Sequence, residues 1–225
     1  MMSLSFTALI NNVALLVAMG VLYRYVKSAH YSGQWPAKLI GGLFLGGVSI
    51  GVMMNPWVMS PGVIFDSRSI LLSVGGLFLG IVPMVIAGAV ASIYRFLIGG
   101  PGAFMGVAVI ITSCAIGVIW AHIRQKPARD YSGWEYYLFG IVVHINLLLW
   151  MFSLPDPIDV TALRNMSPQI MLIFPIGTFL FAKLLAGYEQ QLEDKRKLHE
   201  DEERFKALAE TSPLAIYLST GSHQK

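Results

Sequence analysis

The sequence predicts an all-α integral membrane protein, and three observations carry this prediction: its composition, the placement of its charges and its long apolar runs. Of the 225 residues, 55% are apolar and only 13% are charged, whereas soluble domains are about 25% charged. The charges are also segregated, because residues 1–182 hold nine Lys or Arg and five Asp or Glu, while residues 183–225 hold seven and eight. So few charges could not cover a soluble surface. We therefore expect residues 1–188 to form a transmembrane bundle and the remainder to be built for water.

Five apolar runs are long enough to cross about 30 Å of hydrocarbon at about 1.5 Å per residue. These runs cover residues 5–26, 37–55, 103–123, 134–153 and 168–188. A sixth stretch, residues 67–98, is longer and is interrupted by Gly80 and Pro83. It is compatible with one long tilted helix or with two short helices that meet near Gly80.

Basic residues decide between these two interpretations. Loops 24–38 and 122–133 each carry three Lys or Arg, whereas segment 56–65 carries none and loop 154–167 carries one. The positive-inside rule places the first two loops in the cytoplasm and the other two segments outside. A chain that runs from the outer segment 56–65 to the inner loop 122–133 crosses the membrane an odd number of times. Run 103–123 supplies one crossing, so residues 67–98 must form two short helices, which gives three crossings. The bundle has about seven crossings, an outer N-terminus and a cytoplasmic C-terminus, and its third and fourth helices are glycine-rich and about 14–17 residues long. A re-entrant pair satisfies the same count.

Glycine spacing indicates how these helices pack. The string Gly-Gly-Leu-Phe-Leu-Gly occurs at residues 41–46 and again at 75–80. Each copy contains a Gly-x-x-x-Gly pair, Gly42/Gly46 and Gly76/Gly80, which lets helix backbones approach closely in lipid. The repeat reflects either chance in a glycine-rich chain or a duplication, and both origins predict the same close packing.

The tail is different in kind. Residues 189–210 have high helix propensity and lack Gly and Pro. A broken apolar stripe fits a cytoplasmic signalling helix that continues from the last span and pairs in a homodimer. Residues 211–225 turn apolar after Pro213, as at the start of another domain, and they are too few to complete one. We therefore expect the chain to be the front end of a longer protein.

Two arginines carry the functional prediction. Arg68 begins the third helix and Arg95 lies near the end of the fourth, before a glycine-rich turn. Ionisable residues at membrane depth are costly and indicate function by default. In an antiparallel helix pair both guanidinium groups lie at the outer end, where they would hold a small anion bidentately, assisted by backbone N–H groups of the turn. The alternative is that each arginine reaches the headgroups as an interfacial anchor. The candidate ligand-binding residues are Asp66, Ser67, Arg68, Tyr94, Arg95, Gly99 and Gly100.

Other polar residues indicate packing rather than chemistry. His144 and Asn146 lie within the sixth predicted helix, where interhelical hydrogen bonding is the expected role. Cys114 is the single cysteine, which excludes a disulfide framework. The chain contains no His/Glu pair at metal-ligand spacing, nucleophile elbow or phosphate loop. We expect neither catalysis nor a cofactor in this chain. The net charge of +3 reflects basic membrane loops and does not indicate a nucleic-acid partner.

Most of residues 1–188 resembles the transmembrane receptor domain of the LytS–YhcK type, which stands at the front of bacterial sensor histidine kinases and diguanylate cyclases. The resemblance rests on Asp66-Ser67-Arg68, on the short glycine-rich helices, and on Tyr94-Arg95 followed by Gly99-Gly100. A second, shorter resemblance covers 203–213, which is similar to the entry of a PAS domain.

The receptor resemblance implies a bundle similar to the substrate-binding subunits of vitamin transporters. It also implies a small extracytoplasmic ligand, a carboxylate such as pyruvate in some members. The segment Gly106 to Ile111 is apolar here, where small polar or thiol side chains would be expected in pyruvate-binding relatives. The resemblance therefore transfers the arginine pair to this chain but not pyruvate specificity.

The predicted function is that of a sensory module in the bacterial cytoplasmic (inner) membrane. It binds a small anion from outside and relays binding through the last helix to cytoplasmic output domains, with a response regulator downstream of the full-length protein. The alternative is a substrate-capture subunit of a small-molecule transporter.

Overall fold

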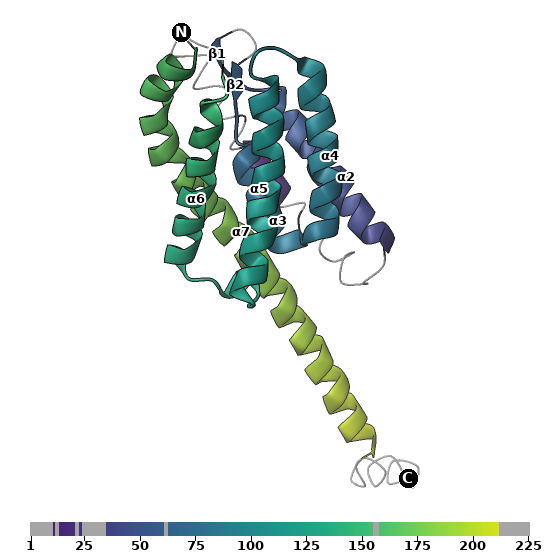
Figure 1. The fold of residues 1–225 in the computed structure, drawn as a ribbon. Coiled ribbons are helices and arrows are strands. Elements are labelled where there is room, and N and C mark those ends of the chain that lie inside the picture. The colour runs from purple at the N-terminus through teal and green to yellow at the C-terminus, as the bar shows by residue number, and fades with distance from the viewer. Residues whose placement is uncertain are drawn as a thin grey trace, which may run out of the picture. The chain divides into compact units, whose positions relative to one another are not determined.

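The computed structural model describes residues 11, 14–20, 23, 35–60, 63–154 and 158–211. Its elements are α2 (Trp35–Met53), β1 (Trp57–Ser60), β2 (Val63–Phe65), α3 (Arg68–Leu79), α4 (Ile81–Ile98), α5 (Ala103–Arg124), the 3₁₀ turn η1 (Ala128–Asp130), α6 (Gly133–Met151) and α7 (Ile158–Thr211), as Figure 1 shows. The chain forms two compact units, Met1–Tyr188 and Glu189–Lys225. Most of the predicted first span, 5–26, and residues 212–225, which make up nearly all of the predicted domain start, lie outside the described residues.

The all-α membrane fold is confirmed. Within the described part of the chain, five helices are long and apolar enough to cross a membrane, namely α2, α4, α5, α6 and the segment of α7 that begins at Ser167. The predicted division of 67–98 is also confirmed, because α3 ends at Leu79 and α4 begins at Ile81. Gly80 between them has φ +77°, a backbone conformation that residues with a side chain rarely adopt.

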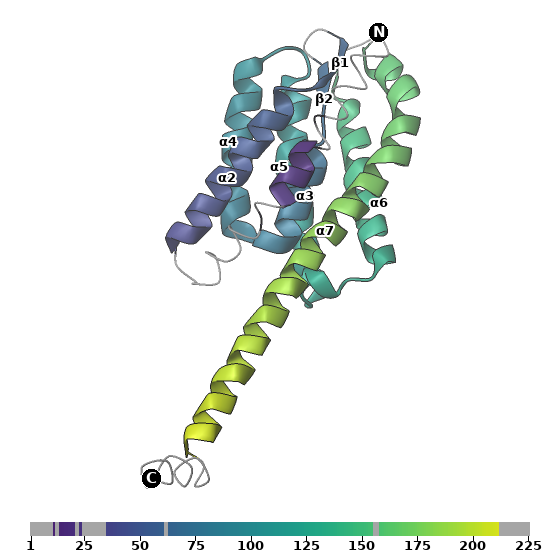
Figure 2. The same ribbon diagram turned by 180° about the vertical axis from the view of Figure 1, so that it is seen from behind.

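Helix α3 is shorter than predicted. Its 12 residues rise only about 18 Å, so the helix alone does not cross about 30 Å of hydrocarbon. An antiparallel hairpin of β1 and β2 precedes it, within segment 56–65, which was predicted from the sequence to lie outside the membrane. The hairpin lies at the end of the bundle where α4 passes into α5, and α3 passes into α4 at the opposite end (Figures 1 and 2). The extended chain before α3 therefore supplies part of the depth that the short helix lacks.

Helix α7 begins earlier than predicted. It starts at Ile158, so the prediction of a loop over 154–167 was wrong for most of its length. Pro168 and Pro175 lie inside the helix, and such residues are tolerated in transmembrane helices because neighbouring groups satisfy the freed backbone. The helix ends at Thr211, which confirms the helical prediction for the charged segment 189–206.

Glycines bring the helix backbones together, as predicted for three of the four paired positions. Cβ atoms added at Gly42 and Gly46 would lie 2.7 Å from Ile86 Cβ and 2.8 Å from Val90 Cβ of α4. A Cβ at Gly76 would lie 2.9 Å from the Cα atom of Gly117 in α5. The fourth position, Gly80, forms the turn between helices instead of a packing contact.

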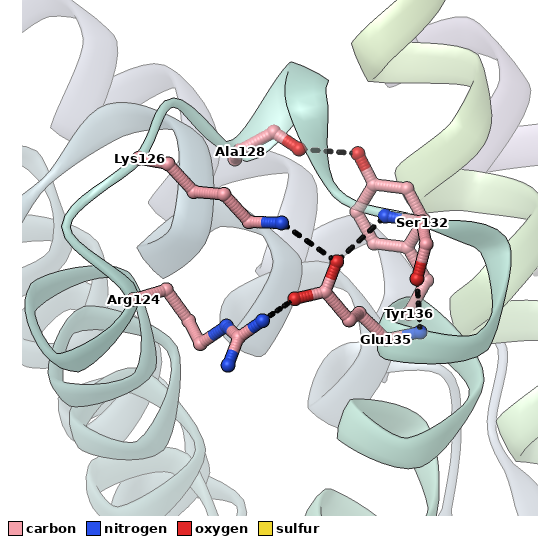
Figure 3. Close-up of polar contacts among 6 residues, drawn as sticks. All are labelled: Arg124, Lys126, Ala128, Ser132, Glu135 and Tyr136. Atoms are coloured by element: carbon pink, nitrogen blue, oxygen red, sulfur yellow. Dashed lines mark hydrogen bonds and ion pairs between the residues drawn. The ribbon is translucent and has the colours of Figure 1, made fainter.

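A compact polar cluster links the end of α5 to the start of α6 (Figure 3). This junction lies at the end of the bundle opposite the hairpin (Figure 1). The Glu135 carboxylate accepts hydrogen bonds from Arg124, from Lys126 at 2.9 Å and from the Ser132 backbone N–H at 2.7 Å. The Ser132 hydroxyl accepts the Glu135 N–H in return, which completes a capping box at the start of α6. Two basic residues of this predicted inner loop are thus held by one acidic residue.

The contact between Gly76 and Gly117 predicts a steric sensitivity. Gly117→Ala should lower the melting temperature of the purified protein in detergent, because the new methyl group would overlap the Ser73 carbonyl oxygen and lie 2.9 Å from Gly76 Cα. Overpacking of a core costs about 1–3 kcal/mol. Gly47→Ala is the matched control, since no atom lies within 4 Å of its added Cβ. Equal melting temperatures for the two variants would contradict this packing.

Candidate anion-binding site

The two predicted arginines lie at the same end of the bundle, inside the protein. Arg68 is the first residue of α3, and Arg95 lies in the last turn of the antiparallel helix α4 (Figures 1 and 2). Arg68 is 5% exposed and Arg95 is 1% exposed. An arginine that anchors at the membrane surface keeps its charged head in water. Burial of both side chains therefore disagrees with the interfacial alternative and leaves two enclosed cations.

Asp66 supplies the counter-charge next to Arg68. Its Oδ1 atom accepts the Arg68 backbone N–H at 3.0 Å and lies 3.5 Å from Arg68 Nε. The other oxygen, Asp66 Oδ2, and the Arg68 Nη1 atom are buried and have no hydrogen-bond partner among the described residues. Buried polar groups normally find partners. The pair thus keeps one acceptor and one donor for a further group.

Arg95 is held by the turn that follows its own helix. Its Nη1 donates to the Gly99 carbonyl oxygen at 2.8 Å, while Gly99 adopts φ +69°. The side chain lies against Gly106 of α5, where an added Cβ would be 2.5 Å from Arg95 Nε. The charges of Arg68 and Asp66 both act on the Arg95 guanidinium. The structure therefore brings Asp66, Arg68 and Arg95 into one electrostatic group.

The remaining predicted site residues have other surroundings. Ser67 is buried just before α3, and its side chain does not cap that helix. Tyr94 packs against the main apolar core. The Gly99 N–H bonds to the Phe96 carbonyl oxygen. Gly100 has φ +84°, and its carbonyl oxygen accepts the Ala103 N–H. The glycines thus shape the turn that holds Arg95.

One donor of this group is left open. The buried Arg68 Nη1 atom has no acceptor among the described residues, and a second buried guanidinium, that of Arg95, lies at the same end of the bundle. Phe65, Met105 and Val109 belong to a buried apolar cluster, and the first two are sequence neighbours of Asp66 and Gly106. Charges enclosed by apolar side chains interact more strongly than charges in water. This arrangement can bind a small anion through charge-assisted hydrogen bonds.

Two neighbouring features were missed or only partly foreseen from the sequence. The absence of a side chain at Gly106 leaves room for the Arg95 side chain, yet in the sequence Gly106 is one small residue in an apolar run. Ser69 Oγ lies 3.4 Å from His144 Nε2 of α6, and nothing in the sequence marks this serine. The interhelical role predicted for His144 and Asn146 is confirmed, since Asn146 Nδ2 donates to Thr112 Oγ1 of α5 at 2.9 Å.

Comparison with known families now identifies the bundle. Residues 19–188 match the family described as the 5TMR of 5TMR-LYT, a match that covers well over half of the chain. The chain belongs to this family. It is therefore a multi-pass membrane receptor domain of the LytS type, as the motifs around Arg68 and Arg95 predicted. No curated protein and no solved structure matched the chain in the corresponding searches.

The buried Asp66–Arg68 pair predicts that removing the Asp66 carboxylate lowers the melting temperature more than removing an exposed carboxylate does. Asp66→Asn should lower the melting temperature strongly, because it removes the carboxylate that pairs with the buried Arg68 guanidinium, a change that costs about 3–5 kcal/mol. Asp130→Asn is the control, since Asp130 is 52% exposed and lies 3.8 Å from Arg129, and exposed pairs contribute about 0–1 kcal/mol. Thermal unfolding monitored by intrinsic fluorescence compares the two. Similar losses in both variants would show that Asp66 does not neutralise the arginines.

Proposed function

We propose that this receptor domain binds a small extracytoplasmic anion, a carboxylate by class, between Arg68 and Arg95. The observation that carries the proposal is the buried Arg68 Nη1 donor, which has no partner among the described residues, together with the burial of a second guanidinium, that of Arg95. A guanidinium fork matches the two oxygens of a carboxylate. The apolar segment from Gly106 to Ile111 offers no further polar side chains, so the arginines supply most of the recognition.

We further propose that the hairpin end of the bundle faces outward and that the tail lies in the cytoplasm. Support comes from three basic residues at the opposite end: Arg124 ends α5, and Lys126 and Arg129 lie between α5 and α6 (Figure 1). Basic loops remain on the cytoplasmic side. This orientation gives the arginine pair access to the outside of a bacterial inner membrane and directs the signal inward.

Helix α7 is the proposed output element. It contains an apolar span and then a charged segment that ends at Thr211. In the second unit Leu198 and Phe205 are exposed and seven residues apart, the spacing at which two helices of a homodimer meet. The full-length protein would be a sensor histidine kinase acting on a response regulator, or a diguanylate cyclase, with a PAS domain after residue 210.

A transporter subunit that captures substrate is the second candidate, because the same kind of bundle serves that role. The charged helical segment after Tyr188 favours the sensor, since a capture subunit has no use for a cytoplasmic signalling helix. The downstream sequence of the gene separates the two: a kinase or cyclase domain supports the sensor, and a coupling surface without an output domain supports the transporter.

The binding proposal predicts a ligand-dependent shift in melting temperature. Purified protein is screened against acetate, lactate, pyruvate, succinate and inorganic phosphate. An anion at about 100 times its dissociation constant adds about 2.7 kcal/mol of stability. Arg68→Ala and Arg95→Ala should both abolish the shift, and the matching Lys variants should retain a smaller one, because ammonium keeps the charge but loses the fork.

Arg196→Ala is the control, because Arg196 lies in the second unit, where it pairs with Glu193 and Glu200. It should keep the full ligand-dependent shift. Stabilisation by the same anion in both Arg68→Ala and Arg95→Ala would overturn the site. A shift lost equally in Arg196→Ala would show that the anion acts through nonspecific charge.

A further inference from the structure

The first turn of α3 contacts α6 through one buried hydrogen bond. Ser69, directly after Arg68, is 1% exposed, and its Oγ lies 3.4 Å from Nε2 of the fully buried His144. The other ring nitrogen, Nδ1, lies 2.7 Å from the Gly140 carbonyl oxygen. Because a carbonyl only accepts, we assign the proton to Nδ1 and the acceptor role to Nε2, so the Ser69 hydroxyl donates to His144.

The same histidine packs against α7 next to Pro175. Its ring centroid lies 5.2 Å from that of Phe174, the residue before Pro175. A Cβ added at Gly140 would lie 3.0 Å from both the Cα atom and the carbonyl oxygen of Pro175, so the α6 and α7 backbones touch here. Proline has no N–H to donate to the carbonyl four residues earlier, so this turn of α7, like the turn at Pro168, bends more easily than an unbroken helix.

Helix α3 also touches α7 directly. Ile70 Cδ1 lies 3.1 Å from the position of an added Cβ at Gly177. Three consecutive residues of α3 thus have separate roles: Arg68 belongs to the candidate anion site, Ser69 contacts His144, and Ile70 contacts α7. A movement of this turn cannot leave the Pro175 region of α7 unchanged, because packed interiors transmit displacement instead of absorbing it.

We propose that His144 is a positioning residue that couples the first turn of α3 to the turn of α7 around Pro175. The proposal rests on the proposed function in one respect, which is that an anion at Arg68 supplies the displacement. In this proposal the turn around Pro175 is the part of α7 that moves, and the Ser69–His144 hydrogen bond and the Ile70–Gly177 contact both act on it. Removing the hydrogen bond frees this turn without touching either arginine.

Hydrogen exchange of the whole chain in lipid nanodiscs tests the coupling without any ligand. His144→Phe and Ser69→Ala each remove the hydrogen bond, and exchange of α7 amides at residues 176–183 should rise about fivefold, the factor for about 1 kcal/mol. Asn146→Leu is the matched control, because it removes a comparable bond from α6 to α5 at Thr112. That control should leave the α7 segment unchanged. Unchanged exchange in both test variants, or an equal rise in the control, overturns the proposal.

A ligand arm separates failure of the coupling from failure of the site. The probe is the anion from the melting screen that stabilises the wild-type protein most. Wild type and His144→Phe should show the same melting shift, but only wild type should show a change in α7 exchange on binding. His144→Gln, which keeps a donor and an acceptor, should restore that change. An equal change in His144→Phe overturns the coupling.

If no probe shifts the melting temperature of wild type, the proposed anion site is overturned. Hydrogen exchange without ligand then decides the coupling on its own. If His144→Phe fails to fold, Ser69→Ala carries both arms, because it removes only one hydroxyl group.

Discussion

Two guanidinium groups and a single carboxylate are enclosed near one end of a bundle whose outer surface is apolar, and much of the local architecture follows from holding them there. Neither arginine reaches solvent, so Arg68 needs Asp66 beside it and Arg95 needs the Gly99 carbonyl oxygen. Burial of charge is costly unless it is paired and hydrogen-bonded. The hairpin, the short helix α3 and the space left by Gly106 all place these groups inside the protein, away from the membrane surface.

Glycine is the second constraint, because it sets the distances between helices. Gly76 and Gly117 bring α3 against α5, and Gly42 and Gly46 bring α2 against α4. Helix α3 is buried along its whole length, so it lies at the centre of the bundle and not at its edge. The helix that begins with Arg68 therefore contacts both α6 and α7 within its first turn. In a receptor domain of this family, these contacts connect the proposed binding site to the last helix.

Much of this could be predicted from the sequence, since length, charge placement and the rarity of arginine at membrane depth are strong signals. The break at Gly80 followed from the positive-inside rule. The hairpin could not be foreseen, because strands of four and three residues leave no alternating pattern. The early start of α7 was missed because residues 158–167 include Asp159 and Arg164, so the apolar run begins only at residue 168. The contacts of Gly106 and Ser69 depend on which helix lies opposite, and a single sequence does not encode that pairing visibly.

The central claim is that Arg68 and Arg95 bind one anion together. The most direct measurement is NMR of protein carrying ¹⁵N-labelled arginine, titrated with the stabilising carboxylate and assigned by the two single-arginine variants. We predict that the Nε resonances of both residues shift and saturate at the same anion concentration, while those of tail arginines such as Arg196 do not move. Independent titration of the two resonances, or movement of the exposed arginines alone, would contradict a shared site.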